Sequence, residues 1–197
     1  MAATLIITAD DFGYHPSYDA GILAALAVAR LDAVSIMAQR VDALPTALLD
    51  SGVALGLHVE AGDPEPQVER FRSIAGRRPD YVDGHHHCHA TAAVTRLASQ
   101  LALPVRSIDA EHRRSLRAAG VRTPDLLIGR MRESERVPPP ELTALPDGWT
   151  EWMVHPGYAA GASGSSYDAG REEDLEMLLG LVLPEGVSRS DQRSLPA

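Results

Sequence analysis

Residues 4–13 have the sequence TLIITADDFG, which changes abruptly from apolar to acidic. The first six residues are rich in β-branched side chains and carry no charge, a pattern typical of a buried strand. Asp10, Asp11 and Gly13 follow at once and indicate a loop. The stretch therefore predicts a buried strand that delivers two carboxylates to one end of a sheet.

Short apolar runs alternate with longer amphipathic segments along the rest of the chain. We expect further strands at residues 33–37, 53–57, 80–83, 104–107, 125–128 and 149–154. We expect helices at residues 18–30, 44–50, 68–75, 91–101, 111–119 and 171–183. Strands that alternate with helices predict an α/β domain with a mostly parallel sheet, in a barrel or a barrel-like arrangement.

The chain of 197 residues is long enough for one domain with a proper core. We expect this domain to cover residues 1–187 and to be followed by a polar, frayed tail at 188–197. The segment 129–145 contains three consecutive prolines, Pro138 to Pro140. It is predicted to be a loop that either covers the site or merely connects two elements.

The composition limits the kinds of molecule that this protein is expected to bind and the compartment in which we expect it. Lys and Arg number 18 and Asp and Glu 27, for a formal net charge of −9, which argues against an extended nucleic-acid surface. The single Cys88 excludes a disulfide within the chain and leaves the compartment open, with a reducing cytoplasm as the default. The N-terminal apolar run lacks a basic segment before it and is too short to span a membrane. We expect a cytoplasmic protein that binds neither nucleic acid nor membrane.

Residues 83–89 have the sequence DGHHHCH. In an extended segment the side chains of Asp83, His85, His87 and His89 point to one face. One carboxylate and up to three imidazoles suit a divalent metal such as zinc, iron, manganese or magnesium. The alternative is a polar run in a solvated loop, or a surface that binds metal without function.

Polar side chains follow four of the predicted strands. Asp10 and Asp11 follow the first, His58 the third, the histidine cluster the fourth and His155 the last. Active residues of α/β folds gather at the carboxyl ends of strands, so we expect these side chains to converge. The two aspartates alone would suit a turn cap. Together with the histidines they favour a metal site in which one carboxylate binds the ion and the other faces the attacking water.

Four motifs occur here in the order found in one known family. They are TADDFG at residues 8–13, GLH at 56–58, DGHHHCH at 83–89 and HPGY at 155–158. Over roughly residues 4–183 the chain resembles the YdjC-like carbohydrate deacetylases of the ChbG and hopanoid-pathway types. The resemblance implies a single-domain distorted (β/α) barrel related to polysaccharide deacetylases. It also implies metal-dependent removal of an acetyl group from an N-acetylated sugar, by metal-activated water.

The resemblance further implies a role for each motif residue. Asp11, His58 and His85 would hold one divalent metal ion, Mg²⁺ or Zn²⁺. Asp10 would be the general base. His155 would be the general acid, or a group that polarises the substrate.

Three more residues are candidates for substrate contacts or for orienting the ligands. His87 and His89 share the predicted face of His85 and are also alternative ligands. Arg106 ends the next short strand, where it would pair with Asp10 or form an unrelated salt bridge.

The chain departs from the family pattern in two places. Only residues 59–75 separate His58 from Gly76, where family members commonly carry a longer insertion, and Gly84 replaces a usual serine. The resemblance therefore implies the reaction class and leaves the substrate open. Alternatives are a metal- or saccharide-binding protein without turnover, and a metal-dependent hydrolase of another acylated substrate. A homodimer is compatible with the resemblance.

Overall fold

The computed structural model describes residues 3–130, 142–161 and 163–196. The strands are β1 (Ala3–Phe12), β2 (Ala33–Ile36), β3 (Ala54–Val59), β4 (Val82–Gly84), β5 (Leu126–Ile128), β6 (Gly148–Val154) and β7 (Ser188–Arg189). The α-helices are α1 (Pro16–Ala27), α2 (Thr46–Leu49), α3 (Pro64–Ala75), α4 (Ala92–Leu101), α5 (Ala110–Ala118) and α6 (Gly170–Leu179). Short 3₁₀ turns lie at residues 38–40, 85–87, 142–144 and 192–194.

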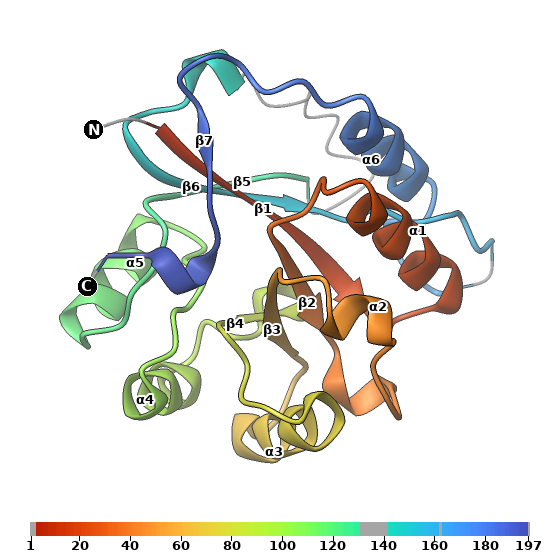
Figure 1. Ribbon diagram of the computed structural model, residues 1–197. Coiled ribbons are helices and arrows are strands. Elements are labelled where there is room, and N and C mark those ends of the chain that lie inside the picture. Colours follow the sequence, from red (N-terminus) through yellow and green to blue (C-terminus); the bar gives the residue numbers. More distant parts are fainter. Residues whose placement is uncertain (1–2, 131–141, 162, 197) are drawn as a thin grey trace.

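The described strands form a parallel sheet in the order β4-β3-β2-β1-β6-β5, and β7 also pairs with β1. Because β4 and β5 lie at opposite ends of this order, the sheet is a curled half-barrel rather than a closed ring (Figure 1). This confirms the predicted α/β class and barrel-like arrangement. The strand expected at 104–107 is reduced to one parallel bridge between Val82 and Val105.

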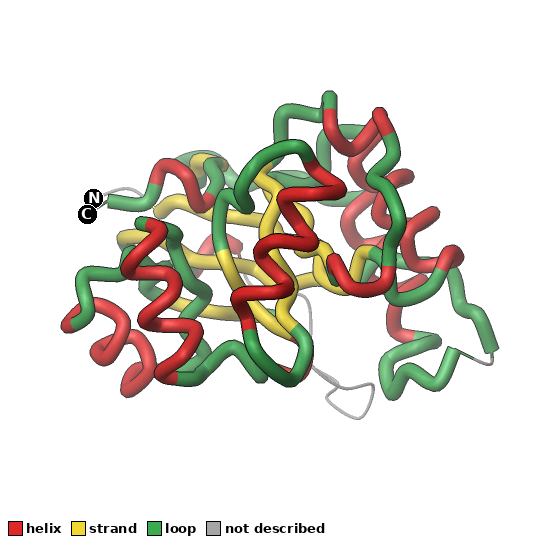
Figure 2. The backbone as a smooth tube through the Cα atoms, turned by 90° about the horizontal axis from the view of Figure 1, so that it is seen from below, coloured by secondary structure: helices red, strands yellow, loops and turns green. Residues whose placement is uncertain are grey.

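The helices lie around the strands (Figure 2), with α1 packed on α6 and α3 on α4. The apolar side chains of β1, such as Leu5 and Ile7, are fully buried in the core. The prediction that residues 4–9 form a buried strand is therefore confirmed. β1 lies in the middle of the strand order, and its last residues lie at the carboxyl end of the sheet.

Helix α3 begins very soon after β3. Asp63 caps it by accepting a hydrogen bond from the Glu65 amide at 3.1 Å, and Pro64 occupies the first helical turn. The helix ends at Gly76, whose φ of 69° suits a glycine C-cap. Residues 60–63 are thus the whole connection between β3 and α3.

The frayed tail predicted at 188–197 is wrong for the described residues 188–196. Strand β7 pairs with the start of β1, and Arg189 forms an ion pair of 2.9 Å with Asp32. Gln192 is buried and donates to Thr8 Oγ1 at 2.9 Å. Several polar side chains of the segment thus bond to charged and hydroxyl groups of the domain. The boundary at residue 187 stays a prediction.

The loop predicted at 129–145 falls largely on residues 131–141, Pro138 to Pro140 included, which lie outside the described residues. Among the helices that the structure describes, none is long and apolar enough to cross a bilayer.

Candidate metal centre and active site

A cavity of about 280 Å³ opens where the carboxyl ends of the strands meet. Its lining includes Asp10 and Asp11 from the end of β1, His58 from β3, His85 after β4 and His155 after β6. Four strands far apart in sequence therefore bring these five residues to one place, as the positions of the strand ends predict.

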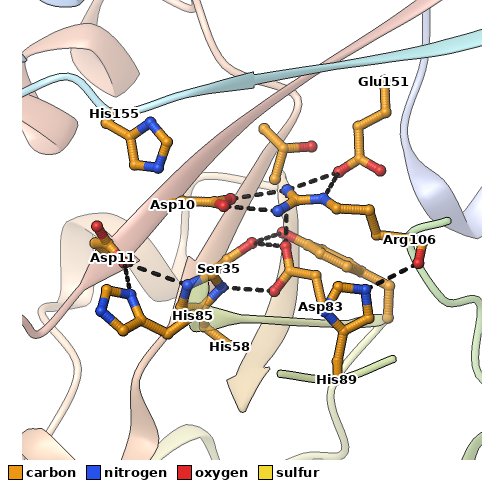
Figure 3. A network of polar contacts seen from close by, with 12 residues as sticks. Asp10, Asp11, Ser35, His58, Asp83, His85, His89, Arg106, Glu151 and His155 are labelled. Carbon is orange, nitrogen blue, oxygen red and sulfur yellow. Dashed lines mark hydrogen bonds and ion pairs between the residues drawn. The ribbon is translucent and has the colours of Figure 1, made fainter. Parts of the chain in front are cut away.

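An irregularity in β1 affects the directions in which the side chains of the two aspartates point. The register of β1 against β2 shifts between Ala9 and Phe12, and Asp11 has a φ of 70°. A left-handed backbone at a residue other than glycine costs on the order of 1–3 kcal/mol and is typical of functional sites. As a result, consecutive carboxylates reach the site in different directions: Asp10 towards Arg106 and Asp11 towards two histidines (Figure 3).

Asp11, His58 and His85 form a compact triplet. Asp11 Oδ1 lies 3.2 Å from His58 Nε2 and 2.9 Å from His85 Nδ1. One ligand atom from each residue lies within 4.8 Å of the others. His58 Nδ1 is also 2.8 Å from Asp83 Oδ1, the contact that commonly orients a metal-ligating histidine. One carboxylate oxygen and two imidazole nitrogens fit a divalent cation.

The charges of this triplet depend on one another. Burial lowers the pKa of His58, but the carboxylates of Asp83, Asp10 and Asp11 raise it well above its usual value. Burial raises the pKa of Asp11, but His58 and His85 outweigh this and hold it well below the usual range. A cation that binds here competes with the proton on His58, so its affinity depends on pH.

A second triplet, Asp10, His58 and Asp83, also meets the distance limits for a metal site. Both of its carboxylates already form ion pairs with Arg106, at 2.6 and 2.8 Å. Arg106 occupies both oxygens of Asp10. Asp11 also pairs with an arginine, Arg171, but only through Oδ2, which leaves Oδ1 to the two histidines. The first triplet therefore fits a cation better.

Arg106 is the centre of a buried network of charges (Figure 3). Its Nη1 and Nη2 donate to the two oxygens of Asp10 at 2.6 and 2.8 Å. Its Nε and Nη2 donate to Glu151 Oε1 at 3.0 and 2.9 Å. Asp83 also accepts from Ser35 Oγ at 2.6 Å. Burial raises the pKa of Asp83, yet Arg106 and His58 hold it below its usual value. Of the two alternatives for Arg106, the structure has the pair with Asp10.

His155 is partly buried at the cavity. Its backbone N–H donates to Asp174 Oδ2 at 2.8 Å, while its Nδ1 has no hydrogen-bond partner among the described residues. Burial lowers the pKa of His155, and the carboxylates of Asp11 and Asp10 offset only part of this. Burial thus favours the neutral imidazole, so the predicted role as an acid requires that His155 first gain a proton.

The extended geometry predicted for residues 83–89 is wrong. Pairing of β4 with β3 ends at Gly84, and residues 85–87 form a 3₁₀ turn with positive φ at His86 and His87. Without a ladder to hold the chain extended, side chains no longer alternate. His85 and His87 line the cavity, and burial lowers the pKa of His87 to about 4.

His89 has a different environment from His85. It is fully buried, and its Nε2 donates to the carbonyl oxygen of Arg106 at 3.0 Å. Burial lowers its pKa to about 3. His89 therefore fixes the backbone that carries Arg106, instead of sharing a face with His85.

Sequence reasoning missed two charged residues of the site. Glu151 lies in the middle of β6, and a carboxylate in an otherwise apolar strand is itself a signal of a buried partner. Arg171 begins α6, lines the cavity and donates to Asp11 Oδ2 at 2.6 Å. Nothing in its local sequence distinguishes it from a solvated helix residue.

Similar proteins of known sequence cover most of the chain. A carbohydrate deacetylase of Mus musculus is 28% identical, over 84% of this chain and 83% of its own. One of Geobacillus stearothermophilus is also 28% identical, over 90% of both chains. The alignments run over 256 and 223 residues, more than this chain has, so both relatives carry insertions.

Solved structures agree on the fold. An Enterococcus faecalis protein described as a candidate cellobiose-phosphate cleavage protein matches with a TM-score of 0.77 and 21% identity, covering 98% of this chain and 99% of that one. A family 4 acetyl xylan esterase from Clostridium thermocellum, in complex with a cobalt ion, matches with a TM-score of 0.50 and 14% identity, covering 95% and 87%.

The family profile described as YdjC-like protein matches residues 4–66 and 63–187. The two matched segments overlap at residues 63–66, at the N-terminus of α3. Together they include all the motifs of the cavity, and the chain therefore belongs to the YdjC-like protein family.

Proposed function

We propose that this protein is a metal-dependent carbohydrate deacetylase that hydrolyses the acetamide of an N-acetylated sugar to acetate and an amino sugar. The observation that carries the proposal is the triplet of Asp11, His58 and His85 beside the arginine-bound Asp10, all in one cavity. The two relatives named carbohydrate deacetylase, matched over most of the chain, support the reaction class.

Asp11, His58 and His85 would hold one divalent cation, Mg²⁺ or Zn²⁺. When bound, such a cation supplies Lewis acidity, which polarises a carbonyl oxygen and makes water a better nucleophile. Asp83 keeps His58 in the required tautomer, because the carboxylate accepts the Nδ1 proton and leaves Nε2 for the cation.

Asp10 acts as the general base. Its carboxylate lines the cavity, and Arg106 holds both of its oxygens in a fixed plane. Each carboxylate oxygen can accept more than one hydrogen bond, so Asp10 can take a proton from the attacking water while it stays bound to Arg106. The water oxygen adds to the acetyl carbon, and the carbon–nitrogen bond then breaks.

His155 serves the departing nitrogen. A histidine donates a proton as an imidazolium, because a neutral imidazole would have to become an anion. Since burial lowers the resting pKa of His155, His155 takes up the proton that Asp10 removes from water and then passes it to the departing nitrogen.

A cytoplasmic location, a homodimeric state and the absence of nucleic-acid partners stay predictions.

Acetate release tests the proposal. Chelator-treated protein is supplied with Mg²⁺, Zn²⁺, Mn²⁺ or Co²⁺ and incubated with N-acetylglucosamine and its β-1,4 oligomers, beside an Asp10→Asn control. We expect metal-dependent acetate that is lost in the control. Stoichiometric metal binding without acetate from any sugar would instead favour another acylated substrate or a binding protein without turnover.

A further inference from the structure

Arg171 is a buried cation to which the proposed reaction assigns no role. Its side chain is 1% exposed, and its guanidinium carbon lies 3.7 Å from the centre of the Tyr18 ring. Its Nε and Nη1 are buried and have no hydrogen-bond partner among the described residues. The ion pair of 2.6 Å between Nη2 and Asp11 Oδ2 is the contact that compensates this buried charge.

The surrounding backbone is shaped to keep Arg171 in this position. Gly157 donates its N–H to the carbonyl of Arg171 at 3.1 Å. A Cβ on Gly157 would lie only 3.1 Å from Tyr18 and 3.2 Å from Arg171 Cδ. Gly21 of α1 is closer still, since a Cβ there would be 2.4 Å from the Gly157 Cα. Gly21 of α1 and Gly157 thus allow α1 and α6 to pack closely on both sides of the stacked guanidinium.

The two oxygens of Asp11 consequently have different partners. Oδ1 faces His58 and His85, and Oδ2 faces Arg171. We infer that Arg171 is a positioning residue that reserves Oδ2, so that Asp11 presents a single oxygen to the cation. This inference rests on the proposed function, whose metal site it describes.

Arg171 also removes one unit of negative charge from beside the metal site. Fewer donor oxygens and less negative charge both weaken the attraction for a cation, and both leave a bound cation a stronger Lewis acid. Arg171 therefore lowers the affinity of the site for a metal ion and raises the electrophilicity of the bound ion. A residue that only packs α6 against α1 would do neither.

Co²⁺ binding to folded, metal-free protein tests this inference without any need for turnover. We expect Arg171→Met to bind Co²⁺ about tenfold more tightly, or more, than the unmodified protein in calorimetry, because attraction over a few ångströms in a buried site is strong. Its visible Co²⁺ absorption should weaken, since a second carboxylate oxygen raises the coordination number. Arg171→Lys keeps the charge and should retain the original affinity.

Arg130→Met is the matched control. Arg130 is a neighbouring, largely buried arginine, 17% exposed, that pairs with Asp174 and Glu173 and not with Asp11. It should leave Co²⁺ affinity and absorption unchanged. Arg171→Gln, which also removes the charge but keeps a donor amide, serves if the methionine variant does not fold.

Two outcomes overturn the inference. One is a folded Arg171→Met or Arg171→Gln protein whose Co²⁺ affinity is unchanged or weaker; the other is an equal gain in affinity in Arg130→Met. Failure of the proposed function gives a different pattern. If Arg171→Met binds Co²⁺ more tightly but the unmodified protein releases no acetate, the deacetylase function is rejected and the positioning role of Arg171 is kept.

Discussion

The two aspartates that end β1 are each paired with a buried arginine, but the two pairs differ in how completely they occupy the carboxylate. Arg106 binds both oxygens of Asp10 and extends the network to Asp83 and Glu151. Arg171 binds one oxygen of Asp11 and leaves the other beside two histidines.

This difference explains how adjacent residues of the same type can have different chemistry. An arginine compensates the charge of each aspartate, but Arg106 occupies both oxygens of Asp10 and fixes its plane. Asp10 therefore suits transfer of a proton better than binding of a cation. Asp11 keeps one oxygen clear of arginine and suits a cation. The positive φ of Asp11 is the local feature that separates the two environments.

Removal of Arg106 should have the largest effect. Three buried carboxylates would lose their shared cation, and breaking even one buried pair costs about 3–5 kcal/mol. We expect Arg106→Met to lose at least this much stability in urea unfolding, and Arg171→Met to lose less. Arg117→Ala, which removes an exposed pair with Asp125, should change stability by less than about 1 kcal/mol. Equal losses in the two buried-arginine variants would mean that the pairs are equivalent.

Substitution of the aspartates should separate catalysis from metal binding. Asp10→Asn should lower kcat about 10²–10⁴-fold and keep its Co²⁺ affinity, since it removes the proposed general base but no proposed ligand. Asp11→Asn should weaken Co²⁺ binding about tenfold or more, because it removes the proposed charged ligand. Calorimetry with Co²⁺, beside acetate release, measures both. Metal loss in Asp10→Asn together with metal retention in Asp11→Asn would reverse the assignment.

The pH dependence of stability tests the support of the Arg106 backbone by His89. Burial lowers the folded-state pKa of His89 to about 3, below its usual value of about 6.5. Its contribution to stability is therefore complete above pH 6.5 and is lost as the pH falls towards 3, at up to about 1.4 kcal/mol per pH unit. His89→Gln keeps a donor for the Arg106 carbonyl and does not titrate. In urea unfolding, the stability difference between the unmodified protein and this variant should shrink between about pH 7 and pH 5, whereas parallel curves would place His89 elsewhere.

The smallest effect is expected at the far edge of the Arg106 network. Gln192 Nε2 donates to Thr8 Oγ1 at 2.9 Å and to Glu151 Oε1 at 3.3 Å. Gln192→Ala should cost about 1–3 kcal/mol of unfolding free energy, because it leaves a buried acceptor on Glu151 with fewer donors. Gln100→Ala, an exposed helix position, is the control. A change no larger than that of the control would mean that the network ends at Glu151.

The convergence of the site was predictable because it follows from strand geometry alone. Asp10, Asp11, His58 and His155 come directly after apolar runs, and parallel strands bring their carboxyl ends to one edge whatever their side chains. The alternation assumed for residues 83–89 failed because it holds only while a neighbouring strand supplies the ladder, and β3 pairs with β4 only as far as Gly84.

The partners of the aspartates were harder to predict. Arg171 lies 160 residues from Asp11 along the chain, and its position depends on how α6 packs against α1, which no local pattern encodes. Glu151 gave a clearer signal, since a charge inside an apolar strand requires a partner, but the sequence does not say which residue that partner is.

The contact between Thr8 and Gln192 also has a consequence for synthesis of the protein. The two residues are 184 positions apart, so β1 leaves the ribosome long before the segment that completes its surroundings exists. Contacts of such separation are formed late and slowly in folding. The nascent chain must therefore keep the apolar residues 5–7 of β1 from aggregating while translation continues. The charged centre at the end of that strand is assembled only when nearly all of this sequence has emerged.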